Sequence, residues 1–181
     1  MAVETKLMTA EELLDLPRGR ARYELVDGEL ITMSPAGAEH GEIAGEIFGR
    51  LRNYVREHRL GTTYAAETGF LLGEGPDSVR APDVAFVRAE RVVRVRTYFP
   101  GPPDLAVEVL SPNDRASQVE AKVRHWLRSG TRMVQVVDPE TKTAVIHTSG
   151  ITTRLAIDDA LDGGDVVPGW KLPLRELFDR D

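Results

Sequence analysis

The sequence predicts an α/β protein in which long helices pack against a mixed β-sheet. An Asp-Gly pair divides two alternating runs within residues 22–33, a strong short-range signal for a β-hairpin. Apolar residues then recur at helical spacing over about residues 38–59. Further along, apolar runs at 104–110 and 132–137 flank a helical pattern that reaches Leu127. This is the order of a parallel strand–helix–strand unit.

A short helix is expected near the N-terminus. Thr9 can cap it, Glu12 completes a capping box, and Pro17 ends it after about Leu16. In the hairpin that follows, Glu24 alternates with apolar neighbours, so its carboxylate faces either solvent or the surface that the hairpin covers. Solvent is the more common outcome for a glutamate in a hairpin.

The long helix at 38–59 turns His40 inward, close to the first turn. A histidine in such a place is more often a satisfied residue at the core boundary than a ligand. Gly45 and Gly49 lie on the opposite side of this helix. Because glycine weakens a helix, close packing against another subunit would explain them, and a homo-oligomer through this face is one alternative.

The chain after the long helix reads as a series of strands. The runs 62–64 and 70–72 have strand composition, and one further strand is predicted across 79–87. Pro82 is tolerable near the start of a strand.

Residues 88–104 form a long connection that contains four arginines. Connections of this length are uncommon, so the segment is either a basic flap over a site or a plain surface excursion. Asn113 or Asp114 is expected to cap the next helix. That helix carries an apolar stripe that must pack on the sheet, formed by Val119, Val123, Trp126 and Leu127.

Composition limits the class of protein. The 181 residues are expected to form a single domain, 1–181, with 41% hydrophobic and 29% charged residues. Zero cysteines exclude disulfides and thiolate metal sites. We find no apolar run near the ~18 residues of a membrane span and no signal pattern, so a cytoplasmic protein without membrane contact is expected.

Charge is distributed unevenly along the chain. The formal net charge of −6 argues against general affinity for nucleic acid, but residues 80–132 hold ten Lys or Arg and six acidic residues. A basic region on an acidic protein is either a local phosphate footprint or a solvated helix face.

Two acidic residues carry the functional hypothesis. Glu108 lies in the middle of an apolar strand, where a lone carboxylate costs several kcal/mol unless it meets a cation, a metal or hydrogen-bond donors. Asp83, on the neighbouring strand, could supply a second oxygen. Two such carboxylates form a minimal site for Mg²⁺, which keeps several waters for chemistry. The plain alternative is a buried glutamate paired with Arg or Lys.

Several segments together resemble the Uma family of bacterial endonucleases, which have the PD-(D/E)XK restriction-endonuclease-like fold. The resemblance extends from about Thr9 to Phe178. Its most specific parts are the runs APDVAFV and VEVLSP at their observed separation, accompanied by YELVDGEL, His40 and VVDP. It implies a restriction-endonuclease-like mixed sheet with helices packed against it.

The resemblance implies Mg²⁺-dependent (or Mn²⁺-dependent) hydrolysis of phosphodiester bonds in DNA. Asp83 and Glu108 match the metal-binding acids, and the backbone carbonyl of Val109 is a further oxygen ligand. The lysine expected two residues after the glutamate is replaced by Leu110, and Lys122 on the following helix matches its migrated position.

The catalytic roles follow from these matches. Lys122 is expected to orient or deprotonate the attacking water or to offset charge in the transition state. Arg115, Arg124 and Arg128 on the same helix compete for the role of this cation. Glu24 and His40 are candidates for steering metal-bound water or substrate.

Two other functions are compatible with the sequence. A nuclease fold that has lost catalysis could serve as a DNA-binding or protein-interaction module, and an acid-and-metal hydrolase could act on small phosphoesters. A test for cleavage of plasmid DNA separates the endonuclease hypothesis from these two alternatives.

Overall fold

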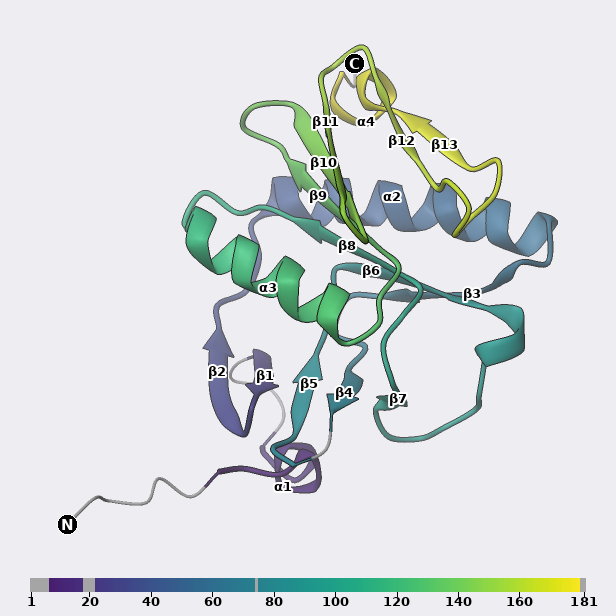
Figure 1. The fold of residues 1–181 in the computed structure, drawn as a ribbon. Helices are drawn as coiled ribbons and strands as arrows, with labels where there is room; N and C mark the ends of the chain where they lie inside the picture. Colours follow the sequence, from purple (N-terminus) through teal and green to yellow (C-terminus); the bar gives the residue numbers. More distant parts are fainter. Residues whose placement is uncertain (1–6, 18–21, 74, 180–181) are drawn as a thin grey trace.

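The computed structural model describes residues 7–17, 22–73 and 75–179, and the other positions, including both ends of the predicted domain 1–181, lie outside this description. Two sheets dominate the fold (Figure 1). The six-stranded sheet has the spatial order β11 (Ile151–Leu155), β10 (Thr143–Thr148), β9 (Met133–Asp138), β8 (Leu105–Val109), β6 (Val84–Arg88) and β3 (Gly61–Ala65). The five-stranded sheet has the order β2 (Glu29–Met33), β1 (Arg22–Val26), β5 (Ser78–Arg80), β4 (Phe70–Gly73) and β7 (Phe99–Pro100).

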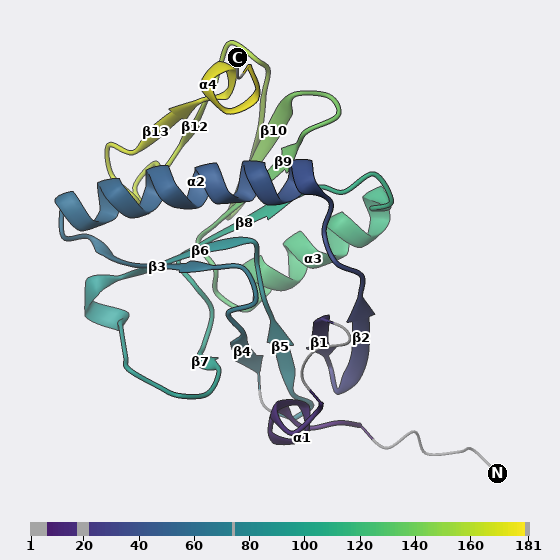
Figure 2. The ribbon, with the colours of Figure 1, turned by 180° about the vertical axis from the view of Figure 1, so that it is seen from behind.

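The two long helices cover opposite faces of the six-stranded sheet. Helix α3 (Ala116–Arg128) lies in front of it in Figure 1, and α2 (Ala38–Glu57) lies in front of it in Figure 2. Strands β8 and β9, joined by α3, pair in parallel, which confirms the predicted crossover unit. The remaining elements are α1 (Ala10–Leu14), η1 (Ala89–Arg91), β12 (Ala160–Asp162), β13 (Lys171–Pro173) and α4 (Leu174–Phe178).

The predicted amphipathic faces form the core. Ile47 and Leu51 of α2 are fully buried against one face of the six-stranded sheet. Val123 and Trp126 of α3 pack against the other face. Burying each such side chain contributes about 1.5–3 kcal/mol, so these contacts fix both helices on the sheet.

Local signals predicted the N-terminal half well. Thr9 and Glu12 form the expected capping box. The hairpin pairs Arg22–Val26 with Glu29–Met33, and both turn residues, Asp27 and Gly28, have positive φ, as this tight turn requires. No helix in the described part of the chain is long and apolar enough to cross a membrane.

The prediction of one strand across 79–87 is wrong. β5 ends at Arg80 in the five-stranded sheet, and β6 begins at Val84 in the six-stranded sheet. Between them, Pro82 has no N–H for a sheet ladder, and the Ala81 N–H donates to the Glu24 side chain instead. The chain therefore crosses from one sheet to the other at this point.

The predicted cap of α3 is also wrong. The N-cap residue is Arg115, which makes no side-chain capping bond. The Asp114 carboxylate accepts a hydrogen bond from the Ser111 N–H in the preceding turn. An aspartate side chain can accept a hydrogen bond either at a helix N-cap or within a turn, and Asp114 accepts the one in the turn.

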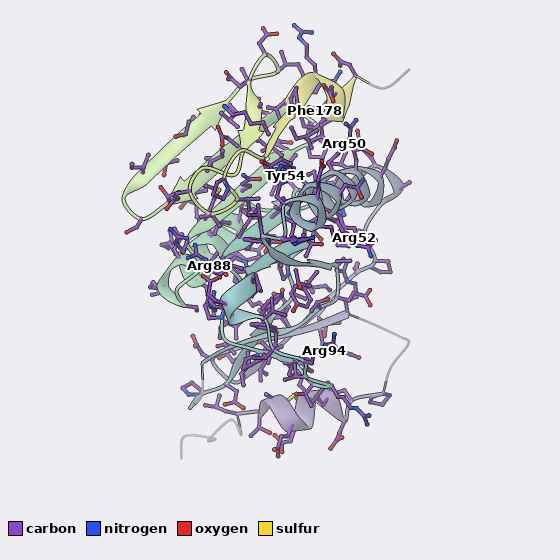
Figure 3. All side chains as sticks on the ribbon, turned by 90° about the vertical axis from the view of Figure 1, so that its right-hand side faces the viewer. Arg50, Arg52, Tyr54, Arg88, Arg94 and Phe178 are labelled. Atoms are coloured by element: carbon purple, nitrogen blue, oxygen red, sulfur yellow. The ribbon has the colours of Figure 1, made fainter. Side chains whose placement is uncertain are left out.

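The connection at 88–104 is packed at both ends, and residues 93–97 in its middle are exposed. Arg88 and Arg91 both form ion pairs with Asp104, which is buried just before β8, and β7 pairs with β4. Figure 3 shows Arg52, Arg88 and Arg94 spread over one side of the molecule. These residues do not gather into a single phosphate footprint.

Candidate active site at the crossing between the sheets

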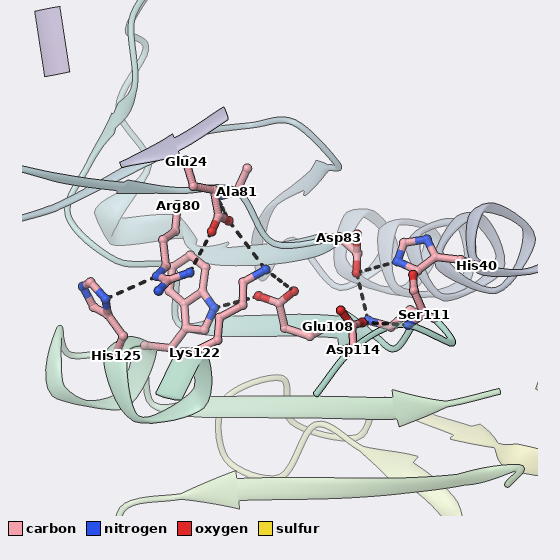
Figure 4. Close-up of polar contacts among 12 residues, drawn as sticks. Glu24, His40, Arg80, Ala81, Asp83, Glu108, Ser111, Asp114, Lys122 and His125 are labelled. Atoms are coloured by element: carbon pink, nitrogen blue, oxygen red, sulfur yellow. Dashed lines mark hydrogen bonds and ion pairs between the residues drawn. The ribbon is translucent and has the colours of Figure 1, made fainter. Parts of the chain in front are cut away.

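The candidate residues meet where the chain crosses between the sheets. Glu24 comes from β1, Asp83 precedes β6, and Glu108 lies near the end of β8 (Figure 4). Lys122 comes from α3 and His40 from the first turn of α2. Five positions far apart in the sequence are thus brought together by both sheets and both long helices.

Lys122 stands between two acidic side chains. Its Nζ donates to Glu108 Oε2 at 2.7 Å and lies 3.5 Å from Glu24 Oε1. The packed residues Val123 and Trp126 fix α3, so the stem of Lys122 runs along the sheet to the end of β8. Although burial lowers the pKa of Lys122, the charges of Glu108 and Glu24 outweigh it and raise the pKa above its ordinary value.

Glu108 is buried, and each of its carboxylate oxygens accepts a hydrogen bond. Its Oε1 accepts from the Trp126 indole N–H at 2.8 Å, and its Oε2 accepts from Lys122. Burial raises the pKa of Glu108 to about 7, an effect that the Lys122 charge reduces and the charges of Asp83 and Glu24 increase. The carboxylates of Asp83, Glu24 and Glu108 therefore lie close enough to act on one another, with Lys122 as the neighbouring cation.

Glu24 points inward, against the more common outcome for a hairpin glutamate. Only 2% of its surface is exposed. Arg80 donates from Nη1 to Glu24 Oε2 at 2.7 Å, and the Ala81 N–H donates to Oε1. Arg80 also donates from Nε to His125 Nδ1, and burial together with the Arg80 charge lowers the pKa of His125.

Asp83 lies beside the end of β8. Its N–H donates to the Val107 carbonyl, and its Oδ2 accepts from the Val109 N–H at 2.8 Å. His40 Nε2 lies 3.2 Å from the same Oδ2. Burial opposes ionisation of Asp83, but the bonds from His40 and Val109 hold its pKa below the ordinary value.

His40 also faces the Val109 carbonyl. The hydrogen bond to Asp83 raises the pKa of His40, burial opposes the rise, and the Val109 carbonyl adds to it. The imidazole thus contacts two of the oxygens that were expected to bind a metal ion. The prediction that His40 leans inward is confirmed, and its partner is an acid of the site.

Comparison with known proteins identifies the family. The model of the Uma2 family, described as "Putative restriction endonuclease", matches residues 10–175. The chain belongs to the Uma2 family. The resemblance predicted from the short motifs is therefore confirmed over nearly the whole described chain.

A solved structure shares the Uma2 fold. It is described as a "putative nuclease belonging to DUF820" from Anabaena variabilis ATCC 29413. The TM-score is 0.82 at 22% identity, and the match covers 95% of this chain and 98% of that chain. This likeness confirms the predicted fold class. No curated protein matches this chain.

The Uma2 site supplies oxygens suited to a hard cation. Asp83, Glu108 and the Val109 carbonyl are all oxygen donors, the class that Mg²⁺ prefers, and the pKa of Glu108 is raised chiefly by burial and further by the charges of Asp83 and Glu24. Among the residues that the structure describes, no three acidic or histidine side chains form a ready-made metal cluster. The fit to Mg²⁺ therefore rests on the chemistry of these oxygen donors alone.

Two residues of the site were missed from the sequence. Arg80 reads as part of an apolar strand, and only the crossing between sheets reveals that it meets Glu24. Trp126 was assigned to the packing stripe, which is correct, but its indole N–H also binds Glu108. A buried tryptophan needs a partner for that N–H, and its position four residues after Lys122 was the available signal.

Proposed function

We propose that this Uma2 protein is a metal-dependent DNA endonuclease whose site consists of Asp83, Glu108 and Lys122. The observation that carries the proposal is the 2.7 Å contact between Lys122 Nζ and Glu108 Oε2. The lysine missing at Leu110 is replaced by one from α3 that reaches the same carboxylate. Acidic side chains at the end of a strand, with a cationic side chain beside them, form the arrangement that metal-dependent phosphodiester hydrolysis needs.

Asp83, Glu108 and the carbonyl of Val109 would hold Mg²⁺ or Mn²⁺. When bound, the ion would polarise the scissile phosphate and lower the pKa of a coordinated water. The hydrogen bond from the Val109 N–H orients the Asp83 carboxylate, and the indole of Trp126 orients that of Glu108.

Lys122 serves as a cation in this proposal. Its raised pKa keeps the ammonium protonated at neutral pH, so it cannot first act as a base. Its N–H groups can instead donate to the phosphate as negative charge develops in the transition state. This favours charge stabilisation among the three roles considered for the lysine.

Glu24 and His40 position the other groups. Glu24 fixes Lys122 from the side opposite Glu108 and is itself fixed by Arg80. His40 holds the Asp83 carboxylate together with its other partner, the Val109 N–H. Neither residue needs to touch the reacting atoms to matter for the rate.

One observation favours a second candidate, a nuclease fold without catalysis that serves as a DNA-binding or protein-interaction module. Both oxygens of Glu108 are already bonded by Lys122 and Trp126. A structural ion pair in a protein interior has the same appearance. The function must therefore be decided by cleavage.

A plasmid assay tests the proposal. Supercoiled plasmid should be nicked or linearised by the wild type with Mg²⁺ or Mn²⁺ and left intact with EDTA. Glu108→Gln and Asp83→Asn should leave it intact. Glu120→Gln is the matched control, since Glu120 is an exposed acid on α3 that forms an ion pair with Arg124, and it should cleave normally.

Other outcomes point to the alternatives. Intact but retarded plasmid with every variant would establish a binding module. Intact plasmid together with hydrolysis of a small chromogenic phosphodiester would establish a hydrolase of small phosphoesters.

A further inference from the structure

A cavity of about 660 Å³ opens beside the candidate active site. It lies between α1, the β1–β2 hairpin and the segments 67–69 and 96–98. Figure 1 shows α1, this hairpin and the five-stranded sheet gathered at one end of the molecule. The cavity has the size of a small-ligand pocket, which typically measures ~300–1,000 Å³.

The cavity lies near the site. Ala81 lines it, and the N–H of Ala81 donates to Glu24. Met33 and Pro35 also line it, just before the helix that carries His40. The Arg22 charge is close enough to oppose the rise in the pKa of His40. The cavity and the site thus meet at Ala81 and Arg22.

The walls suit a flat apolar group. Leu13, Leu16 and Val79 supply aliphatic surface, and Tyr23 and Tyr98 supply aromatic rings. The Tyr98 ring lies against the backbone of Gly69, where an added Cβ would come within 2.4 Å of it. Only glycine at that position lets the ring lie as it does. Aliphatic and aromatic walls of this kind accept a nucleobase by stacking.

The cavity also has cationic groups suited to a phosphate. Arg22 has a buried Nε without a hydrogen-bond partner, and its nearest acid is the Glu67 side chain at 3.5 Å, which is 71% exposed. Arg96 is exposed and forms no ion pair with any residue in 7–17, 22–73 or 75–179. Buried donors are normally hydrogen-bonded, and this Nε has only the long ion pair with Glu67, which also lines the cavity. A phosphate oxygen would give it a charge-assisted hydrogen bond.

We propose that this cavity holds one unstacked nucleotide of the DNA strand that enters the active site. Its base packs between the tyrosine rings and the leucines, and its phosphate faces Arg22 and Arg96. The inference rests on the proposed function and specifies its substrate class. A base inside a duplex must leave its stack to enter, at a cost of a few kcal/mol. The preferred substrate is therefore single-stranded or locally unpaired DNA.

Binding measured without divalent metal tests this directly. Fluorescence anisotropy with the full chain in EDTA compares a labelled single-stranded oligonucleotide with its duplex. The single strand should bind at least about 10-fold more tightly, since stacking contributes ~1–3 kcal/mol per base. Arg96→Ala should weaken single-strand binding about 5-fold or more. The matched control is Arg94→Ala, an exposed arginine outside the cavity, which should bind as the wild type does.

A second pair of variants avoids any change of charge. Gly69→Ala displaces the Tyr98 ring and should weaken single-strand binding, whereas Gly73→Ala adds its methyl group to open space and should not. Circular dichroism checks that both variants fold. If Gly69→Ala does not fold, the arginine pair still decides the outcome.

Two results would overturn the proposal. If the duplex bound as tightly as the single strand, the protein would not bind an unstacked nucleotide in this cavity. If Arg94→Ala and Arg96→Ala weakened single-strand binding equally, the DNA would be attracted by the general positive charge of this surface and not bound in the cavity. The assay involves neither metal nor cleavage, so it can succeed while the plasmid assay fails, or fail while that assay succeeds.

Discussion

Lys122→Ala is expected to reduce DNA cleavage at least about 100-fold while the protein remains folded. The side chain supplies the one cation within hydrogen-bond distance of Glu108 among the described residues, and no arginine of α3 has its geometry. Lys122→Arg should restore charge without the same fit and recover only part of the rate. Initial rates of plasmid cleavage, with thermal unfolding as a check of folding, measure both effects.

The pH profile separates a direct role from an indirect one. The Lys122 charge lowers the pKa of Glu108 from what burial alone would give, so its removal raises that pKa above about 7. The residual activity of Lys122→Ala should then rise with pH over a higher range than in the wild type. Raising the pH should nevertheless leave most of the loss in place if the ammonium itself contacts the phosphate.

Arg124→Ala is the matched control, because Arg124 is exposed on the same helix and its ion pair is with the exposed Glu120. It should cleave at nearly the wild-type rate. If Lys122→Ala cleaved normally and Arg124→Ala did not, the assignment of Lys122 as the catalytic cation would be wrong.

Arg80→Met is expected to lower the free energy of unfolding by about 3–5 kcal/mol. The Arg80 side chain is 9% exposed and that of Glu24 2% exposed, so the substitution leaves a buried carboxylate short of a partner. Lys122, at 3.5 Å, compensates only in part. Urea unfolding at neutral pH measures the change.

A paired design identifies the cause of that loss. Combining Arg80→Met with Glu24→Gln removes the uncompensated charge, so the double variant should be more stable than Arg80→Met alone. Arg124→Met, which breaks an exposed pair, should change stability by less than about 1 kcal/mol. A loss of similar size in Arg124→Met would indicate that the effect of Arg80→Met is not due to burial.

The fold was predictable from the sequence wherever local signals were sufficient. The capping box at Thr9, the Asp-Gly turn and the apolar faces of α2 and α3 depend on neighbouring residues, and each appears as predicted. The crossing between the sheets at Ala81–Asp83 could not be predicted, because the run 79–87 has the composition of one continuous strand. Which sheet a residue joins depends on distant partners that the local pattern does not contain.

The same limit explains what was found and missed in the site. Glu108 was identifiable because a carboxylate in an apolar strand requires a partner, whereas Lys122 was identified from the family resemblance, and its position beside the buried stripe made that assignment physically reasonable. The alternating pattern allowed the Glu24 side chain to face either solvent or the covered surface, and it did not show that the covered surface was correct. Arg80 carried no local sign of its role, since its contact with Glu24 joins two strands of the five-stranded sheet.

The most direct test of the central claim is a crystal soaked in Mn²⁺, analysed by anomalous diffraction. A peak should lie between the carboxylates of Asp83 and Glu108 and the carbonyl of Val109, with oxygen distances near the ~2.0–2.1 Å of Mg²⁺. The same soak of Glu108→Gln should lack the peak. A peak bound elsewhere, or an unchanged peak in Glu108→Gln, would contradict the assignment of these residues as the metal site.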